Sequence, residues 1–517
     1  MKVVTSEEMR LLESRAADAG VSAESLMESA GLAVARSVAR RLDGVRSKRI
    51  VVLVGPGNNG GDGMVAARYL ADWGAVVTLY MTTARRREDK YEECRERRCR
   101  VVEASEDLEC WQLESYLSLA DLVLDAVLGI GAHPGLDPIL RAIFESVGQM
   151  RMQPQRPLFA ALDLPTGLDA DTGECDEACF PADMTLALGA PKVGLLQFPG
   201  AGHAGEIETL HIGLPQGVDA GLPLDLMDTA LSRSLLPPRH ADGHKGSFGS
   251  VLVVGGHRRY VGAPVLASSS AYRVGAGLVS LAAPESVSRI AAARLLEQVH
   301  VPLAETPDGG VAGESAGIAR EALNEASAAV VGPGLGTGES SAAFLRSLVL
   351  TEPAVHTPLV LDADALNILA NIYGWPSMLS APAVLTPHPG EMGRLLGRAA
   401  YEVQEDRKGA AAASAELWGQ VVVLKGAHTV VAAPDGRIAL SPFANPALAT
   451  AGSGDVLAGV IGGLLAQGMD RYEAAVAGVY LHGAAAERWR ASNGSSGMLA
   501  SDLLTLLPRV TEDTRSR

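Results

Sequence analysis

The run Gly452-Ser453-Gly454-Asp455 combines residue types that could bind a phosphoryl group and help to transfer it. The apolar residues after Asp455 recur at helical spacing, so the run predicts a loop that opens into a helix. Glycines there leave the first amide groups of the helix open to an anion. A carboxylate would repel that anion unless it takes a proton from the attacking hydroxyl. An isolated run of this kind is more often an ordinary Gly-rich helix start, so other motifs must decide.

Length and composition limit the possible functions. A chain of 517 residues predicts two domains. The net charge of −16 and the 4% of aromatic residues argue against nucleic acid or an anionic membrane as a partner, which favours small molecules. The N-terminus lacks a signal-like apolar run, and no later segment is a membrane-span candidate. We therefore expect a cytoplasmic protein.

The cysteines give no metal-binding pattern in the sequence. None of the close pairs is joined by histidines at the spacing of metal ligands, so we expect reduced thiols. The cysteines are at positions 94, 99, 110, 175 and 179.

The first half alternates buried strands with helices. Ile50–Val54 is a continuous apolar run typical of a parallel strand buried on both faces, and the Gly-rich turn at 55–63 leads into a helical pattern. A strand, a Gly-rich turn and a helix in this order predict a nucleotide site at the carboxyl end of a sheet. Further strands are expected at Val76–Met81, Leu122–Leu124, Leu158–Leu162 and Met184–Leu188.

Chemically active residues follow several of these strands. Asp125 precedes Gly129-Ile130-Gly131, Asp163 begins a second turn, and Lys192 follows the last strand. Taken alone, Lys192 would be a surface lysine and Asp125 a helix cap. Because the carboxyl ends of parallel strands meet at one edge, together they suggest a site.

The segment from Gly213 to Pro238 is rich in Gly, Pro and Asp and predicts the junction between a domain at 1–220 and a domain at 225–512. The second half again alternates strands and helices, so two doubly wound α/β domains are expected. The expected strands of this half are 251–254, 278–282, 328–331, 359–361, 384–385 and 421–424.

Strand ends of the second half also carry glycines, acids and bases. The Asp362–Asn367 and Lys425–Thr429 segments each follow an expected strand. His388 lies between two prolines and is held rigidly, which makes a purely structural role less probable than for most histidines. Glu391 could simply cap the next helix.

The first half resembles the NAD(P)H-hydrate epimerase domain, a Rossmann-like three-layer sandwich. The resemblance rests on Asn58–Gly63, Asp163–Asp169 and Pro191–Leu195. It implies K⁺ ligands at Asn59, Asp125 and Thr166, and a proton-transferring pair of Asp163 and Lys192. It also implies that the hydrated nucleotide contacts Asn58, Asn59, Gly60, Gly61, Asp62, Gly129, Ile130, Gly131, Ala132, His133, Pro134, Gly135 and Asp163.

The second half resembles the ADP-dependent NAD(P)H-hydrate dehydratase, of ribokinase-like fold. This resemblance implies Asp455 as the catalytic base, with Ala263, Gly336 and His388 also at the hydrated nucleotide. It further implies that ADP contacts Lys425, Gly426, Ala427, His428, Thr429 and Gly454. One departure is the segment 257–260, where bulky and basic residues replace the small residue and Gly-Met usual in the family.

The whole chain is thus similar to bifunctional NAD(P)H-hydrate repair enzymes. The resemblance implies epimerisation of the two hydrates of NADH and NADPH (NADHX and NADPHX). It also implies ADP-dependent dehydration of the S hydrate with release of AMP and phosphate, Mg²⁺ beside the nucleotide, and a homo-oligomer without nucleic-acid or membrane partners. Two alternatives stay open at this point: a second domain that is a kinase for a hydroxymethylpyrimidine, thiazole or sugar, and a first domain that is a non-catalytic binding module.

Overall fold

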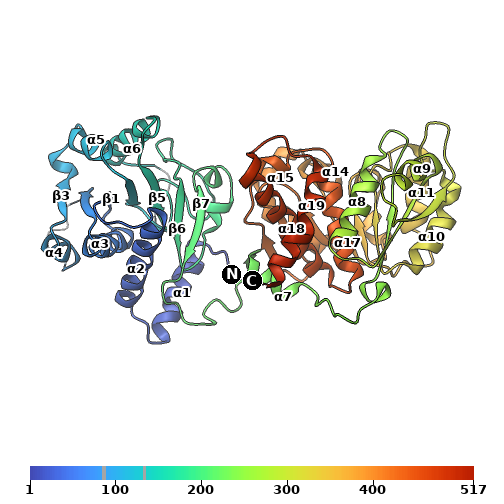
Figure 1. The fold of residues 1–517 in the computed structure, drawn as a ribbon, viewed down its shortest axis with the longest axis horizontal. Coiled ribbons are helices and arrows are strands. Elements are labelled where there is room, and N and C mark those ends of the chain that lie inside the picture. Colours follow the sequence, from blue (N-terminus) through green and yellow to red (C-terminus); the bar gives the residue numbers. More distant parts are fainter. Residues whose placement is uncertain (84–88, 132–134, 517) are drawn as a thin grey trace. The chain divides into compact units, whose positions relative to one another are not determined.

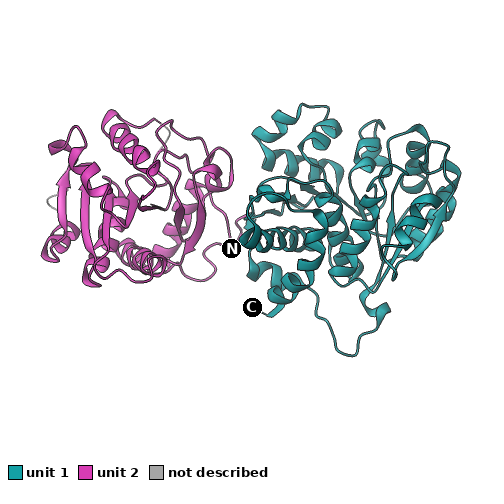
Figure 2. Ribbon diagram, turned by 45° about the horizontal axis from the view of Figure 1, so that its top comes forward, with its two compact units in different colours: residues 1, 223–517 teal, residues 2–222 magenta. Residues whose placement is uncertain are grey.

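The structure, a computed structural model, describes residues 1–83, 89–131 and 135–516. The chain forms two compact units, one of Lys2–Leu222 and one of Pro223–Arg517 with Met1 (Figures 1 and 2). Each unit is an α/β domain around a largely parallel sheet, which confirms the predicted fold class. Within the described ranges, no helix has both the length and the apolar composition needed to cross a bilayer.

The described residues of the first unit form a seven-stranded sheet of order β3-β2-β1-β4-β5-β6-β7. All paired strands run parallel. The order reverses between β1 and β4, and ligands of such sheets bind where this reversal occurs. The strands are β1 (Arg49–Val54), β2 (Val76–Met81), β3 (Arg100–Glu103), β4 (Leu122–Ala126), β5 (Leu158–Leu162), β6 (Met184–Leu188) and β7 (Glu206–Leu210).

Helices cover both faces of this sheet. Leu26 and Val34 of α2 pack on one face with Met64 of α3, whereas Leu117 of α5 and Phe144 of α6 pack on the other. The unit therefore has three layers. Its α-helices are α1 (Ser6–Asp18), α2 (Ala23–Arg41), α3 (Asn58–Asp72), α4 (Asp89–Glu96), α5 (Trp111–Leu117) and α6 (Pro138–Arg151).

The predicted junction is more ordered than its composition indicated. Within it, β8 (Leu224–Leu226) pairs in parallel with β17, and α7 (Thr229–Leu235) follows. Leu224 and Met227 are buried in the second unit. A second domain starting at residue 225 would divide β8, which begins at Leu224. The Pro-, Gly- and Asp-rich composition suggested a linker, but a few apolar residues anchor this segment to the sheet. The structure changes from one unit to the other between Leu222 and Pro223.

The second unit has a ten-stranded sheet among its described residues, of order β11-β10-β9-β12-β13-β14-β15-β16-β17-β8. The strands from β11 to β15 are parallel, and β16 is antiparallel to both neighbours. Its further strands are β9 (Ser250–Val254), β10 (Leu278–Pro284), β11 (Val299–Leu303), β12 (Ala328–Val331), β13 (Leu359–Leu361), β14 (Ala383–Leu385), β15 (Val421–Leu424), β16 (Val430–Ala432) and β17 (Ile438–Leu440). Its further α-helices are α8 (Gly262–Arg273), α9 (Glu285–Ala292), α10 (Ala316–Glu325), α11 (Glu339–Val349), α12 (Asp364–Leu369), α13 (Trp375–Met378), α14 (Pro389–Leu396), α15 (Ala400–Glu405), α16 (Arg407–Trp418), α17 (Ser453–Ala466), α18 (Arg471–Asn493) and α19 (Ala500–Ser516).

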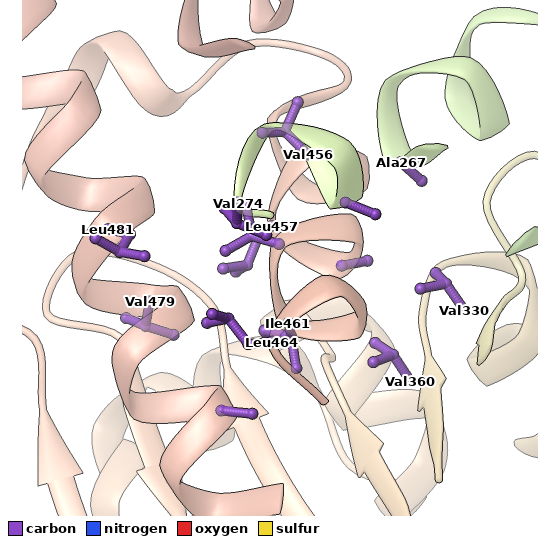
Figure 3. Packing of buried hydrophobic residues seen from close by; sticks show 14 of the residues in the cluster. Ala267, Val274, Val330, Val360, Val456, Leu457, Ile461, Leu464, Val479 and Leu481 are labelled. Carbon is purple, nitrogen blue, oxygen red and sulfur yellow. The ribbon is translucent and has the colours of Figure 1, made fainter. Parts of the chain in front are cut away.

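Helix α17 is the central helix of the second core (Figure 3). Ile461 belongs to the buried cluster that also contains Val330 of β12 and Val479 of α18. Gly459 faces the carbonyl of Ala267 on α8 so closely that a β-carbon at this position would overlap it. The small residue lets two helices approach, which fixes the start of α17 over the carboxyl end of the sheet.

Candidate active sites

The start of α17 carries Asp455 in its first turn, after Gly452 in the left-handed region with φ of 89°. Lys425 follows β15, and Asp362 follows β13. The Lys425 Nζ donates a hydrogen bond of 2.6 Å to Asp362 Oδ1 and lies 3.8 Å from Glu391 Oε2. These strand ends therefore bring an amino group and three carboxylates together at a helix N-terminus.

The turn that carries Asp362 is held under backbone strain. Ala363 has φ of 52°, which residues other than glycine rarely adopt. Hydrogen bonds hold the turn in place: Thr386 Oγ1 donates to Asp362 Oδ1 at 2.8 Å, and the Gly336 amide donates to Asp364 Oδ2 at 2.8 Å. Strain of this kind is typical of functional sites, where the surroundings enforce it.

Two carboxylates of this cluster, Asp455 and Glu391, have raised pKa values. Burial, with the nearby Asp362 carboxylate, raises the pKa of Asp455 to about 7. Burial raises the pKa of Glu391 to about 7 even though Lys425 opposes this shift. Burial alone would lower the pKa of Lys425, but Asp362 and Glu391 outweigh it and the net shift is upward. Asp455 is therefore poised to exchange a proton near neutral pH.

The flanking histidines have different environments. His388 caps α14: its Nδ1 accepts the amide of Gly390 at 3.0 Å, and its own amide donates to Glu391 Oε2 at 2.8 Å. The capping role that the sequence suggested for Glu391 is thus present. His428 has φ of 49° and is buried, with its Nδ1 3.0 Å from the Ser441 carbonyl. Of these two side chains, that of His388 is the more exposed.

Two other predicted positions are Thr429, in the turn after β15, and Ala263, in the first turn of α8. Thr429 Oγ1 donates to the Gly426 carbonyl at 2.9 Å, which closes the turn around Ala427. Ala263 lies at the start of α8, where a β-carbon on Gly334 would be 3.2 Å from it. Gly334 and Gly336 belong to the loop after β12, so Ala263 and the predicted Gly336 are on neighbouring loops.

The first unit has a cavity of about 830 Å³ at the carboxyl ends of its strands. The cavity is lined by apolar side chains such as Met27 and by a polar set from different elements. Predicted residues in its lining are Asn58, Asn59, Asp62, Gly129, Ile130, Gly131, Asp163 and Lys192. Glu13 of α1 also lines it and was not predicted. Gly60 and Gly61 are buried in α3, Gly135 lies in the loop before α6, and the predicted positions 132–134 lie outside the described residues.

Asp163 and Lys192 form a buried ion pair at the floor of this cavity. Lys192 is fully buried, and its Nζ contacts Asp163 Oδ1 and donates to the Leu188 carbonyl at 3.0 Å. Asp163 has φ of 66°, another strained position at a strand end. Burial and the Asp163 carboxylate raise the pKa of Asp62 well above its ordinary value. A buried ion pair and a carboxyl group with a raised pKa thus share one cavity.

Asp125 and Thr166 are hydrogen-bonded to each other, and Asn59 is linked to them through the backbone of Leu128. Asp125 accepts the Thr166 hydroxyl at 2.7 Å and the Thr166 amide at 2.8 Å. Asn59 Nδ2 donates to the carbonyls of Leu128 and Leu162 at 2.9 and 3.1 Å, which leaves its amide oxygen on the opposite side. Burial raises the pKa of Asp125 to about 6. The structure thus brings the three residues together, with Asp125 as a buried carboxylate.

Comparison with known proteins decides the family. The family model described as NAD(P)H-hydrate dehydratase matches residues 251–509, and that described as YjeF-related protein N-terminus matches residues 23–194. The bifunctional NAD(P)H-hydrate repair enzyme of Moorella thermoacetica is 40% identical over 521 residues, which are 99% of this chain and 96% of that protein. The enzyme of the same name from Thermofilum pendens is 38% identical, over 99% of this chain and 96% of its own.

The chain belongs to the bifunctional NAD(P)H-hydrate repair enzymes. A solved ADP/ATP-dependent NAD(P)H-hydrate dehydratase from Bacillus subtilis, co-crystallised with ATP and Mg²⁺, is 34% identical. It matches 57% of this chain and all of that chain with a TM-score of 0.50. A ribokinase-like protein from Enterococcus faecalis matches with a TM-score of 0.50 at 23% identity and supports the fold of the second unit. The alternative of a kinase fused to a binding module is not favoured.

For this repair-enzyme family member, sequence reasoning missed some site residues. Asp362 lies in a strand-end segment to which the sequence assigns no role, yet it anchors Lys425. Glu13 gave no signal, because an acid in a surface-like helix has no motif around it; only the fold brings it to the cavity. Lys425 is predicted to contact ADP, and the structure adds that its amino group joins the Asp455 cluster.

Proposed function

We propose that the second unit dehydrates hydrated NADH and NADPH, with ADP as phosphoryl donor and Asp455 as base. The observation that carries this proposal is the convergence of Asp455, Lys425 and Asp362 at the N-terminus of α17. Deprotonated Asp455 takes the proton of the C6 hydroxyl while the hydroxyl oxygen attacks the terminal phosphorus of ADP, and the bond from that phosphorus to the bridging oxygen breaks to release AMP. The phosphate formed at C6 then leaves with the C–O bond electrons, C5 loses a proton, and the nicotinamide double bond results.

The residues present fit ADP and its metal. Amide groups at the start of α17 favour negative charge, and Lys425 supplies a positive charge beside them. Asp362 and Glu391 flank Lys425 and offer the oxygen donors that Mg²⁺ prefers. When bound, Mg²⁺ neutralises part of the phosphate charge. The position of His388 at the same rim suits a contact to the hydrated nucleotide.

In the first unit we infer an epimerase whose proton-transferring groups are Asp163 and Lys192. The Asp163 carboxylate and the Leu188 carbonyl both accept hydrogen bonds from the Lys192 amino group. These two bonds fix the orientation of its N–H groups. Epimerisation at C6 requires that the hydrated ring opens to a carbonyl or loses its hydroxyl and then closes on the other face. A base and an acid in one cavity serve that reaction, and Asp62, with its raised pKa, is a suitable acid. The cavity-lining loop at 129–131 and Asn58 would hold the nucleotide.

We also infer that K⁺ binds at Asn59, Asp125 and Thr166. The donor set fits this large, weakly hydrated cation, because it offers one buried carboxylate and neutral oxygens. A cation there would offset the cost of burying the Asp125 charge. The stabilisation of the reduced full chain by K⁺ and by Li⁺ can be compared in thermal unfolding. K⁺ should raise the midpoint and speed epimerisation, whereas Asp125→Asn should abolish both effects; equal responses to the two ions would contradict the site.

The test of the proposed function is direct. The full chain is incubated with a mixture of both hydrate epimers, ADP and Mg²⁺, and the return of reduced-nicotinamide absorbance is followed together with AMP and phosphate. We expect complete conversion and one AMP per nicotinamide restored. Formation of a stable phosphorylated product without absorbance recovery would support a kinase instead. A cytoplasmic location and assembly into a homo-oligomer stay predictions, which cell fractionation and light scattering would test.

A further inference from the structure

Cys175, Cys179 and His203 of the first unit form a compact group of metal-ligating side chains. One donor atom of each residue lies within 4.8 Å of the other two. His203 is far along the chain from both cysteines, so no spacing in the sequence indicates that the three residues meet. The group includes none of the residues assigned above to the nucleotide or to K⁺.

We propose that Cys175, Cys179 and His203 bind one Zn²⁺ ion, with the fourth position taken by water. Two thiolates and one imidazole are soft to borderline ligands, which select Zn²⁺ over Mg²⁺, Ca²⁺ or K⁺. Donor atoms gathered within 4.8 Å of one another can converge on an ion of tetrahedral preference after small side-chain adjustments. Three protein ligands leave a coordination position open.

Backbone hydrogen bonds fix the segments that present these ligands. Cys175 forms an isolated β-bridge with Leu168, and the Cys179 amide donates to the Asp176 carbonyl at 2.9 Å. The His203 amide donates to the Gly200 carbonyl at 2.8 Å, and its own carbonyl accepts the Ala182 amide at 2.9 Å. The ligands are thus held by the fold before any ion arrives, which lowers the entropic cost of binding.

The imidazole of His203 has an unmet bonding capacity. Its Nδ1 is buried, and the described residues provide no hydrogen-bond partner for it. A buried polar atom without a partner costs free energy, and coordination through this atom would supply the missing interaction.

The two sulfurs differ in burial. Both must lose their thiol protons when they coordinate Zn²⁺. Cys179 is buried and Cys175 is only partly so, which leaves a path for the ion from solvent. Asp176 is not a ligand, because Leu136, Arg141 and Ala178 already donate to its carboxylate.

The proposed zinc site lies behind the loop that carries the K⁺ ligand Thr166. A β-carbon added to Gly167 would be 3.3 Å from the β-carbons of both Asp176 and Cys179. Zinc would therefore hold the wall against which this loop packs. We expect the ion to stabilise the first unit and its cavity without touching the nucleotide.

The test uses the reduced, tag-free full chain after treatment with a chelator. Co²⁺ is titrated in as a spectroscopic substitute, and binding is followed through the thiolate-to-cobalt charge-transfer absorption and the visible bands of tetrahedral Co²⁺. Zn²⁺ should displace one equivalent per chain. The variants are Cys175→Ser and His203→Gln, with Cys110→Ser and His211→Gln as matched controls elsewhere in the same unit. Circular dichroism verifies that each variant is folded.

Loss of an outer partner of a metal ligand costs about 10–100-fold in affinity, so loss of a ligand should cost about 100-fold or more. Cys175→Ser and His203→Gln should show that loss, weaker charge transfer and no rise of the thermal midpoint with Zn²⁺, whereas both controls should behave like the parent. Absence of thiolate charge transfer in the parent, or equal affinity in parent and variants, would overturn the proposal. The proposal would also be overturned, in favour of a redox pair, by two results together. These are ready formation of a Cys175–Cys179 disulfide without reductant and no metal uptake when reductant is present.

Discussion

Gly454 lies directly against the amino group of Lys425: a β-carbon at Gly454 would be 3.3 Å from the Lys425 Nζ and 4.0 Å from Asp362 Oδ2. The missing side chain therefore leaves the space in which the helix amides and the ammonium group can both face one anion. Its backbone does not have a positive φ, so the glycine is needed for this space and not for its conformation.

Replacement Gly454→Ala should separate fold from nucleotide binding. Alanine is favoured over glycine in a helix by about 1 kcal/mol, so the thermal midpoint should stay the same or rise. The added methyl displaces the Lys425 amino group and narrows the anion site, so the KM for ADP should rise by about tenfold or more while epimerisation is unchanged. Gly468→Ala, at a left-handed position beyond α17, is a contrasting control that should lower stability without raising the KM. An unchanged KM for ADP in Gly454→Ala would contradict the idea that ADP binding needs the space beside Gly454.

Asp455→Asn should nearly abolish dehydration while ADP still binds. The amide keeps the shape of the side chain but cannot accept the hydroxyl proton, and general-base catalysis contributes about 10²–10⁴-fold. The kcat of dehydration should fall within that range, with the affinity for ADP, measured by calorimetry, changed little. Glu416→Gln, which removes an exposed carboxylate on α16, should leave the kcat unaltered. Turnover near the parent value in Asp455→Asn would exclude the base assignment.

Dehydration should depend on pH through the same carboxyl group. Its pKa is raised to about 7, so Asp455 is protonated below that pH and cannot act as a base. The kcat/KM should therefore rise as pH increases from about 5 and level off above about 8, with an apparent pKa near 7 that belongs jointly to Asp455 and its coupled neighbours. A flat profile over this range would show that another group takes the proton.

The same shift makes a prediction about stability. An Asp whose pKa is raised on folding holds a proton that the unfolded chain releases, so its contribution to stability is lost as pH rises from the unfolded value of 3.8 to about 7. Asp455→Asn lacks that loss. Its thermal midpoint should exceed that of the parent at pH 8, and the difference should shrink toward pH 4. A constant difference across this range would contradict the shift.

The buried pair of the first unit can be tested by a double replacement. Lys192→Met alone leaves Asp163 charged and unpaired, and breaking a buried pair in this way costs about 3–5 kcal/mol. The midpoint of the first unit should fall sharply and epimerisation should stop. In Lys192→Met with Asp163→Asn the midpoint should largely recover, whereas epimerisation should stay absent because the proton-transferring pair is gone. Recovered epimerisation in the double variant would show that the pair is only structural.

The two units should work independently when the chain is divided between Leu222 and Pro223. A fragment 223–517 should dehydrate the S hydrate with ADP and then stall, and addition of fragment 1–222 should restart conversion of the other epimer. A fragment 229–517 lacks β8 and should unfold at a lower temperature, because β17 becomes an unprotected edge. Consumption of both epimers by 223–517 at equal rates would contradict the epimerase role of the first unit.

Buried parallel strands could be predicted from the sequence, whereas edge strands and the short strands β16 and β17 next to the β8 edge could not. Val251–Val254 is a continuous apolar run because it is covered on both faces. By contrast, β7 reads Glu-Ile-Glu-Thr-Leu and is half-exposed at an edge, while β8, β16 and β17 have only three residues each. Such short segments carry too few residues for a period to emerge, and their pairing depends on partners far along the chain.

The candidate sites show the same limit. Asp163, Lys192 and Asp455 could be identified because each stands in a motif at a strand or helix end, where parallel topology gathers side chains. The pairing of Lys425 with Asp362 and the approach of His203 to Cys175 depend on how segments far apart in the sequence come together in space. The residues around these positions form no local sequence pattern from which either contact could be predicted.

The place of β8 in the second sheet has a consequence for synthesis on the ribosome. Leu224 pairs with Ile438, so the first strand of the second unit to be made finds its partner only after nearly all of that sheet has been translated. The first unit is complete at Leu222 and can fold while its successor is still being translated. During that interval β8 has no partner strand, and its backbone hydrogen-bonding groups stay unpaired. Because β8 is only three residues long, it offers few backbone groups with which another nascent chain could pair, which limits aggregation.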